Sequence, residues 1–354
     1  MRIVIFGLTV SSSWGNGHAT LWRSLIRALD REGHEVVFYE RDAPYYAAHR
    51  DLPVLPGAAK LRLYGAWEDI RGEARATIHD CDAAIVTSYC PDGRAACASV
   101  LDAKTATRVF YDLDTPVTLE KLEAGKDVPY LPPQGLGDFD LVLSFTGGRA
   151  LELLRDRLGA RECEPLYGSV DPDHHKPVPT DPAWRAACSY LGTWSHDRQD
   201  MLDALFLASA RRRPAETFVL GGSQYPDHVE WPANVRRHDH VPPPAHSAFY
   251  CSSPVTLNVT RTPMARLGYC PSGRLFEAAA CGVPVITDSW PGLDTFFTPE
   301  EEILIATTTD DALAALGLSA EELASIGKRA RERTLDEHSG TQRARELLSL
   351  ITGA

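Results

Sequence analysis

The sequence predicts an α/β protein with two doubly wound parallel sheets, each in a domain of its own. The chain has 354 residues, more than a single hydrophobic core usually holds, so two domains of roughly 170 residues are expected. Short apolar runs alternate with amphipathic, helix-like segments along the chain, as in successive β–α–β units. This pattern starts at residue 2 and begins again near residue 189, which predicts one sheet in each half.

The first half opens with a strand, a helix and a second strand. Residues 2–8 and 34–40 are the strand-like runs RIVIFGL and HEVVFYE, and an amphipathic helix between them ends at Gly33. Further strands are expected at 61–64, 83–88, 107–113 and 140–145. They end in polar or small residues, where an open α/β sheet binds its ligands. The first loop has its glycines at 7, 15 and 17, which does not fit the G-x-G-x-x-G spacing of dinucleotide-binding proteins.

The second half repeats the pattern after a segment rich in proline. Residues 171–184 are expected to form an interdomain linker. Strand, glycine loop and helix then follow over residues 189–214, and the tail from 319 to 352 is strongly helical. The other predicted elements are strands at 217–222, 233–238, 254–260, 283–287 and 301–306, and helices within 242–253 and at 274–281.

Composition excludes several classes of protein. A net charge of −12 argues against DNA or RNA as a partner, because these demand a basic face. The eight cysteines include no C-x-x-C pair, so neither a disulfide framework nor a zinc ribbon is expected. Met1-Arg2 leads directly into the first strand, and no apolar run reaches the length of a membrane span. We therefore expect a cytoplasmic protein with reduced thiols.

One stretch organises the second half. Residues 271–288 read PSGRLFEAAACGVPVITD, in which Ser272 is a good N-cap and Gly282 a natural helix stop. The N-terminus of such a helix attracts anions, and Gly273 lets an anion approach the backbone. Glu277 lies on the same helix face about 6 Å further along, roughly the span from a diphosphate to the ribose of a nucleotide. The alternative is an ordinary β–α unit whose Glu faces solvent.

This stretch resembles the donor-nucleotide site of GT-B glycosyltransferases, and most of all that of the spore-maturation (CgeB-type) family. The flanking runs LNVTR and FFTPEEEILIA share the likeness, as do SSSWGNGHATLWRSL, ERDAPYYA, VTSYCPD, VFYDLDTPVTL, LGDFDLVLSFTGG and PLYGSVDP in the first half. In the wider superfamily the second Glu of an E-x7-E pair holds the donor ribose, and Glu277 matches it. The first Glu would fall at Tyr269, so the resemblance leaves the stereochemistry of the reaction open.

The resemblance implies two Rossmann-like domains facing a cleft, with the C-terminal helix crossing back to the first domain. The implied boundaries are an acceptor-side domain at 1–170, a linker at 171–184, a nucleotide-sugar domain at 185–330 and the returning helix at 331–354.

The resemblance also implies a donor site made of strand ends and the helix within 271–288. Arg261 is placed to neutralise the leaving diphosphate, whereas Arg274 is expected to face solvent. The implied donor-binding residues are Gly192, Thr193, Arg198, His240, Val241, Arg261, Ser272, Gly273 and Glu277.

Catalysis is expected from the first half. His18 follows Asn16 and Gly17 in the first strand-to-helix loop, and imidazole suits proton removal from a hydroxyl. Asp112 and Asp114 end a strand and could orient His18 or contact the acceptor. Asn16 and Gly17 are also expected on the acceptor side. Their D-x-D spacing also occurs in metal sites of other glycosyltransferases. Alternatively, Asp114 is only a helix cap before Thr115-Pro116 and His18 only packs.

The predicted function is transfer of a sugar from a nucleotide-sugar, the co-substrate, to a hydroxyl or amine acceptor without a metal or other cofactor. His238-Asp239-His240 and His174-His175 lack the spacing of a tetrahedral metal site. The aromatic residues Trp14, Tyr45, Tyr46, Tyr89 and Tyr130 could line an acceptor pocket or belong to ordinary packing. Two alternatives stay open: a nucleotide-sugar epimerase on the same fold, and a catalytically silent nucleotide-sugar-binding protein.

Overall fold

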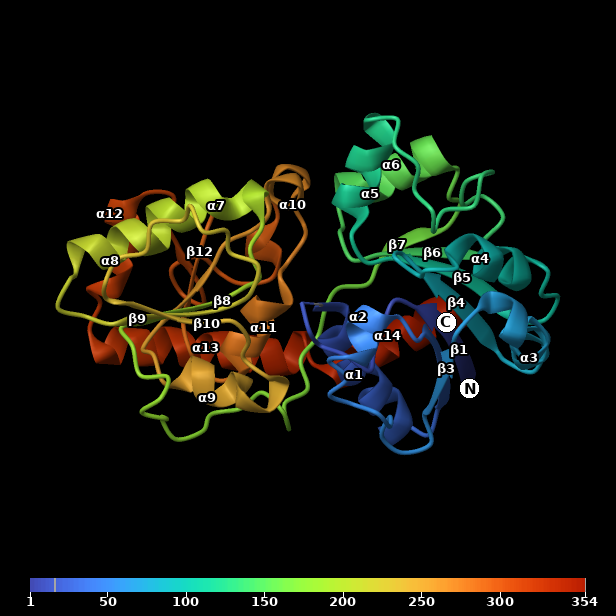
Figure 1. The fold of residues 1–354 in the computed structure, drawn as a ribbon, viewed down its shortest axis with the longest axis horizontal. Helices are drawn as coiled ribbons and strands as arrows, with labels where there is room; N and C mark the ends of the chain where they lie inside the picture. Colours follow the sequence, from blue (N-terminus) through green and yellow to red (C-terminus); the bar gives the residue numbers. More distant parts are fainter. Residues whose placement is uncertain (16, 354) are drawn as a thin grey trace. The chain divides into compact units, whose positions relative to one another are not determined.

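The chain folds into two compact units, seen in a computed structural model that describes residues 1–353 except residue 16 (Figure 1). The first unit contains residues 1–167 and the segment from Gly340 onward. The second contains Gly168–Ser339. Each unit has its own parallel sheet with helices packed on it, as the alternating strand and helix pattern predicts.

The first unit holds a sheet of seven parallel strands in the order β3-β2-β1-β4-β5-β6-β7. Its strands are β1 (Arg2–Gly7), β2 (Glu35–Arg41), β3 (Lys60–Tyr64), β4 (Ala83–Thr87), β5 (Thr107–Asp112), β6 (Leu141–Ser144) and β7 (Cys163–Pro165). The strand order reverses between β1 and β4, where Ile3 pairs with both Val36 and Ala83. Such a switch point is where doubly wound sheets bind ligands. The short strand β7 was not predicted.

Helices cover both faces of this sheet. They are α1 (Gly17–Arg31), α2 (Pro44–Ala47), α3 (Trp67–His79), α4 (Gly93–Leu101), α5 (Thr115–Glu123), α6 (Arg149–Leu158) and α14 (Gly340–Thr352). Because side chains alternate along a strand, Ile3 and Ile5 pack with α1 and α14, whereas Val4 and Phe6 pack with α3 and α4. Both faces are therefore buried, which explains the nearly continuous apolar strands.

The second unit repeats the arrangement with six parallel strands in the order β10-β9-β8-β11-β12-β13. These strands are β8 (Cys188–Leu191), β9 (Phe218–Gly221), β10 (Val235–His238), β11 (Thr256–Asn258), β12 (Val285–Thr287) and β13 (Leu304–Ile305). Its helices are α7 (His196–Leu202), α8 (Ala208–Arg212), α9 (His246–Cys251), α10 (Thr262–Leu267), α11 (Gly273–Ala280), α12 (Thr309–Leu316) and α13 (Ala320–Glu337). A π-helical turn, Asp203–Leu207, joins α7 to α8, and short 3₁₀ turns occur at Pro243–Ala245 and Leu293–Thr295. Helix α10 was not predicted.

The helical tail is two helices rather than one. Helix α13 ends at Glu337, and its Gly327 approaches the backbone of Gly282 so closely that a side chain would not fit. Helix α14 begins at Gly340 and packs on α1 through Ala344, Leu347 and Ile351. The return of the C-terminal helix to the first unit is confirmed, but it starts at Gly340 instead of 331.

The segment predicted as a linker, 171–184, has no helix or strand but is attached to the second unit. Ser247 Oγ donates a hydrogen bond to the His174 carbonyl (2.8 Å), and Ser252 Oγ accepts one from Asp181 N (2.8 Å). These bonds fix the segment against α9, so the proline-rich composition reflects a packed loop rather than a free hinge. No helix in the described part of the chain is long and apolar enough to cross a membrane.

Candidate active site

The switch point of the first sheet brings His18 and Asp114 together. His18 is the second residue of α1, which follows β1, and Asp114 lies just beyond the end of β5. Their side chains are hydrogen bonded, with 2.9 Å between His18 Nε2 and Asp114 Oδ2. Asp114 occupies the N-cap position of α5 but makes no side-chain capping bond. Its carboxylate therefore orients the imidazole instead of capping the helix.

Asp112, the last residue of β5, lies behind this pair and is fully buried. Its Oδ1 accepts a hydrogen bond from Asp114 N (3.1 Å), while Oδ2 has no hydrogen-bond partner among the described residues. Burial raises the pKa of Asp112 to about 6, although nearby Thr118 and the Asp114 amide oppose the shift. Asp112 thus fixes the backbone that carries Asp114.

An aromatic ring lies against the catalytic candidate. Tyr89, two residues beyond the end of β4, packs edge-on against the His18 ring with 5.9 Å between ring centroids. Its φ of 61° is a left-handed conformation that non-glycine residues seldom adopt. Lys121 Nζ lies 4.9 Å from the centre of the Tyr89 ring. Strained backbone at the end of a strand is typical of functional sites.

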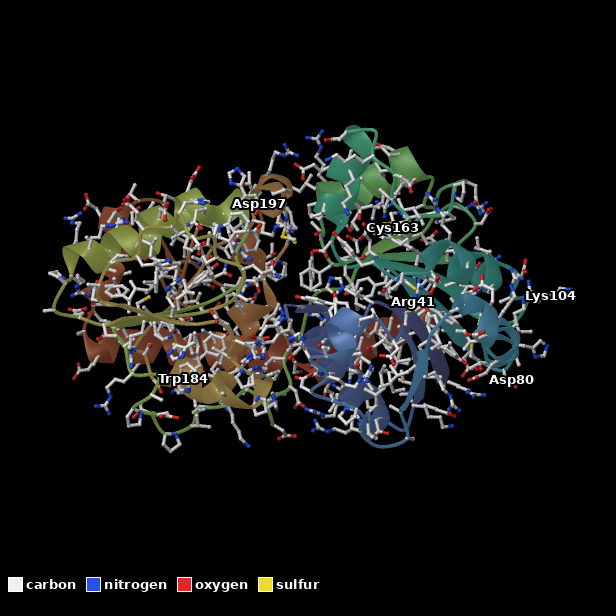
Figure 2. The ribbon with its side chains drawn as sticks, viewed as in Figure 1. Arg41, Asp80, Lys104, Cys163, Trp184 and Asp197 are labelled. Atoms are coloured by element: carbon white, nitrogen blue, oxygen red, sulfur yellow. The ribbon has the colours of Figure 1, made fainter. Side chains whose placement is uncertain are left out.

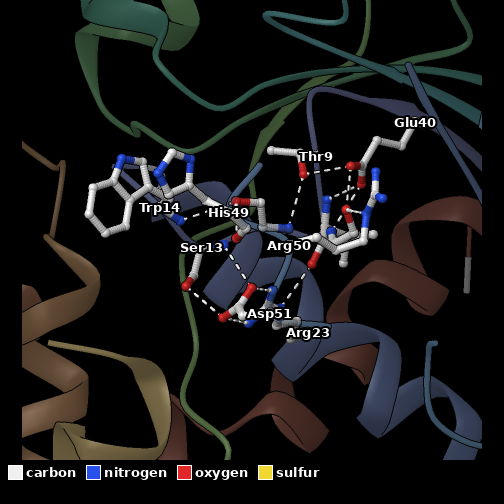
Figure 3. A network of polar contacts seen from close by, with 11 residues as sticks. Thr9, Ser13, Trp14, Arg23, Glu40, His49, Arg50 and Asp51 are labelled. Carbon is white, nitrogen blue, oxygen red and sulfur yellow. Dashed lines mark hydrogen bonds and ion pairs between the residues drawn. The ribbon is translucent and has the colours of Figure 1, made fainter. Parts of the chain in front are cut away.

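The loop between β1 and α1 is held by one buried carboxylate, that of Glu40 at the end of β2 (Figure 3). Its Oε2 accepts hydrogen bonds from the backbone N–H groups of Val10 (2.7 Å) and Ser11 (3.0 Å). Its Oε1 accepts from the hydroxyls of Thr9 (2.8 Å) and Ser11 (2.5 Å). Sequence reasoning missed Glu40, although a charged residue ending a buried strand is a signal that could have pointed to it.

A second carboxylate holds the far end of the same loop. Asp51 accepts two hydrogen bonds from Arg23 (2.6 and 3.0 Å) and two from Ser13 (2.7 and 3.1 Å) (Figure 3). Trp14 stacks on the ring of His49, with 4.3 Å between centroids. These contacts hold the loop as far as Trp14. Asn16, also predicted on the acceptor side, lies outside the described residues. Gly17, predicted there as well, begins α1.

In the second unit, helix α11 has the predicted form. It begins at Gly273 after Ser272 and is followed by Gly282 in a left-handed conformation (φ 74°). Glu277 is 8% exposed, and its Oε2 accepts a hydrogen bond from the Tyr250 hydroxyl (3.0 Å). Ser272 makes no side-chain capping bond, and its Oγ accepts instead from Arg274 (3.1 Å). The alternative of a solvent-facing Glu is therefore wrong.

The loop after β8 contains the predicted Gly192 and Thr193. A side chain at Gly222 would meet the Gly192 carbonyl, so two backbones touch here. Arg198 is 9% exposed and donates a hydrogen bond to the Thr193 carbonyl (2.5 Å). Burial lowers the pKa of its guanidinium, and the positive charges of Arg274 and Arg261 lower it further. These mutual effects indicate that the three arginines, on α7, directly before α10 and on α11, lie near one another, and positive charge of this kind favours an anion.

Arg261 is not a free cation. It forms an ion pair with Asp197 of α7 (2.9 Å), and Thr262 Oγ1 donates to the Asp197 carbonyl (2.5 Å), which ties α7 to α10. Asp197 is labelled in Figure 2, beside α10. Arg274 was expected to face solvent, but it is half-buried and donates to Ser272 Oγ. Arg198 and Arg274 therefore join Arg261 as candidates for neutralising a diphosphate.

The predicted base-contacting segment, His240 and Val241, follows β10. Val241 is buried, and its carbonyl is hydrogen bonded to His246 Nε2 (3.1 Å). Asp288, which sequence reasoning missed, accepts a hydrogen bond from Thr260 N (2.8 Å) and so fixes the backbone next to Arg261. Its place at the end of the run VPVITD was the available signal.

The main feature that sequence reasoning missed is a cluster of side chains around Glu277. His175, His246 and Glu277 are all buried, and one potential ligand atom of each lies within 4.8 Å of the others. Burial lowers the pKa of His175 to about 4, against the opposing effect of the Glu277 charge. Burial raises the pKa of Glu277, but the imidazoles, the Tyr250 hydroxyl and Arg274 outweigh it and the net shift is downward. No spacing rule connects residues 71 and 31 positions apart.

Comparisons with known proteins agree with this architecture. Residues 198–349 match the family model described as glycosyl transferase-like. Sucrose-phosphate synthase from Thermosynechococcus elongatus is similar in structure, with a TM-score of 0.69 at 15% identity, covering 100% of this chain and 98% of that one. The fold is that of the GT-B glycosyltransferases. A search of curated protein sequences gives no match.

Two further GT-B structures contain nucleotide ligands. HepE from Anabaena, in complex with UDP-glucose, has a TM-score of 0.66 at 11% identity over 100% of both chains. An alpha-glucosyltransferase in complex with UDP and a 13-mer DNA has a TM-score of 0.66 at 13% identity over 99% of both chains. Similar GT-B structures thus include one solved with a nucleotide-sugar and one solved with DNA.

Proposed function

We propose that the protein is a glycosyltransferase that uses a UDP-sugar as donor and needs no metal ion. The observation that carries this proposal is the arrangement on α11, where the helix N-terminus at Gly273 and the buried carboxylate of Glu277 share one face. An anion at a helix N-terminus and a diol at a carboxylate one turn away match the diphosphate and ribose of a nucleotide. Nucleotide ligands in similar folds support uridine as the base.

The leaving diphosphate would be stabilised by the three arginines. Arg198, Arg261 and Arg274 supply positive charge, and the first N–H groups of α11 supply hydrogen-bond donors. Together they can offset the charge that develops as the bond between the anomeric carbon and the phosphate oxygen breaks. This is the basis for proposing that the diphosphate is neutralised without a metal.

The acceptor would be activated by the first unit. Asp114 accepts from His18 Nε2–H, which selects the tautomer whose Nδ1 carries the lone pair. His18 would remove the acceptor proton while the acceptor oxygen bonds to the anomeric carbon and UDP departs with the bonding electrons. In this proposal Asp114 is a positioning residue, and Asp112 and Glu40 fix the backbone around the pair.

The run PSGRLFEAAACGVPVITD and the other runs quoted with it resemble the spore-maturation (CgeB-type) glycosyltransferases. This resemblance supports the finer proposal that the protein is a member of that group. The eight cysteines, all free thiols, support a reducing compartment such as the cytoplasm. The acceptor proposed is a small molecule or glycan with a hydroxyl or amine. The net charge of −12 disfavours nucleic acid.

Product analysis tests the proposal. Purified protein is incubated with UDP-glucose, UDP-galactose or UDP-N-acetylglucosamine and a simple hydroxyl acceptor, in chelator-treated buffer. A new glycoside and free UDP are expected, with turnover unchanged by EDTA. An epimerised sugar nucleotide without glycoside would identify an epimerase, and binding without turnover a silent binding protein. Turnover lost in EDTA and restored by manganese would contradict metal independence.

A further inference from the structure

The cluster of His175, His246 and Glu277 has features that donor binding does not require. The three side chains are 3%, 9% and 8% exposed, and they come from the 171–184 segment, α9 and α11. A ligand atom of each lies within 4.8 Å of the other two. Among the described residues, this is the one group of three or more His, Cys or acidic side chains with such geometry.

Two of the three side chains are oriented by partners on their far side. His246 Nε2 is hydrogen bonded to the Val241 carbonyl (3.1 Å), so Nε2 carries the proton and Nδ1 the lone pair. The Tyr250 hydroxyl donates to Glu277 Oε2 (3.0 Å), which leaves Oε1 available to another partner. Metal-binding imidazoles and carboxylates are typically held in this way by a carbonyl or hydroxyl behind them.

The third side chain lacks hydrogen bonds. Neither ring nitrogen of His175 has a partner among the described residues, and neither does Nδ1 of His246. A buried polar group without a partner is unfavourable. One ion bonded to His175, to His246 Nδ1 and to Glu277 would give one nitrogen of each imidazole a partner.

We propose that His175, His246 and Glu277 bind a divalent transition-metal ion of the zinc class, and that this ion competes with the donor for Glu277. Two imidazole nitrogens and one carboxylate are a ligand set that zinc accepts, with a fourth position left for water. Bonds of about 2.0–2.2 Å would draw the three ligand atoms together. A Glu277 carboxylate engaged by the ion cannot also accept both ribose hydroxyls, so the ion inhibits donor binding.

Metal binding itself does not depend on the proposed function, whereas the competition does. The first experiment therefore uses zinc alone. Chelator-treated full-length protein is titrated with Zn²⁺ against a chromophoric chelator, and Co²⁺ is added separately to record its ligand-field absorption. One tightly bound equivalent and the intense visible bands of four-coordinate Co²⁺ are expected.

Three variants and one control define the site. His175→Ala and His246→Ala should each lower zinc affinity by more than 100-fold, because they remove a ligand. Tyr250→Phe should lower it about 10–100-fold, as expected for loss of a supporting hydrogen bond. His174→Ala, which removes the neighbouring imidazole outside the cluster, should leave zinc affinity unchanged. Circular dichroism and the thermal midpoint report whether each variant is folded.

The proposal is overturned if wild type binds no equivalent of zinc, if the His174 variant loses as much affinity as the His175 variant, or if Co²⁺ bound to wild type is six-coordinate. The Co²⁺ spectrum and the conservative Tyr250→Phe change keep the proposal testable even if an alanine variant fails to fold.

Competition is measured with UDP as the probe. Stoichiometric zinc should weaken UDP binding at least tenfold in wild type but not in His175→Ala, which also controls for zinc bound to UDP itself. Equal UDP affinity with and without zinc in wild type would refute the competition. Failure of UDP to bind in either condition would instead refute the proposed donor, and the zinc titration would still decide the metal site.

Discussion

The first strand-to-helix loop of each unit occupies the same place in the same sheet order, yet the two loops are held by opposite charges. The loop after β1 is fixed by the carboxylate of Glu40, and the first turn of the following helix presents His18. In the loop after β8, the Thr193 carbonyl accepts a hydrogen bond from the guanidinium of Arg198, which lies in the first turn of α7.

This difference follows from what each loop is proposed to bind. A hydroxyl acceptor is neutral and must lose a proton, so the first unit gathers carboxylates around an imidazole. A diphosphate is anionic, so the second unit gathers arginines around backbone N–H groups. In this proposal the same scaffold supports two chemistries through a few residues at its strand ends, and substitutions in either unit test one side of the contrast.

The largest expected effect is on turnover in the first unit. Replacing a general base typically lowers the rate by 10²–10⁴-fold, so His18→Ala should lower kcat to that extent. Asp114→Asn should lower it less, because the imidazole remains but loses its orientation. Steady-state kinetics with a saturating UDP-sugar measure both. An effect on KM alone would mean that His18 positions the acceptor without taking its proton, and unchanged kinetics would remove it from the site.

The next effect is on the stability of the acceptor-side loop. Glu40→Ala leaves the buried N–H groups of Val10 and Ser11 without their acceptor. Each unsatisfied group should lower the free energy of unfolding by about 1–3 kcal/mol. Glu40→Gln should cost less, because its amide oxygen can accept from the same N–H groups while the hydroxyls of Thr9 and Ser11 reverse their roles. Urea unfolding gives both values. Equal losses in the two variants would contradict this account of the loop.

A third effect is the pH dependence of stability that arises from Asp112. Burial raises its pKa from 3.8 to about 6, so the folded state keeps a proton that the unfolded chain releases between those values. The contribution of Asp112 to the free energy of unfolding therefore falls by about 3 kcal/mol in total as the pH rises from about 4 to about 6. Asp112→Asn should lack this dependence. Unfolding free energies measured across that range in both proteins test it, and parallel curves would contradict it.

The sequence predicts the fold of this protein more fully than it predicts the candidate site. The two parallel sheets, Gly282 as a helix stop and the face shared by Gly273 and Glu277 followed from local patterns, because strand runs and helix caps are written in adjacent residues. The meeting of His18 with Asp114 was expected as one of several alternatives, since each follows a strand of the same sheet, β1 and β5, which β4 separates.

What could not be predicted depends on tertiary contacts. The packing of 171–184 on α9 arises from hydrogen bonds to Ser247 and Ser252, which proline content does not reveal. The pairing of Arg261 with Asp197 and the meeting of His175 with His246 and Glu277 join segments far apart in the chain. Their positions are set by how the helices pack, and no local pattern encodes them.

The most direct test of the central claim, that Glu277 holds the donor and His18 does not, is calorimetric titration of UDP in chelator-treated buffer. A carboxylate that accepts ribose hydroxyls contributes about 1.5–3 kcal/mol per hydrogen bond, so Glu277→Gln should weaken UDP binding at least tenfold. His18→Ala and the exposed control Glu321→Gln should bind as wild type does. Wild-type affinity in Glu277→Gln, or an equal loss in His18→Ala, would contradict the division of labour between the two units.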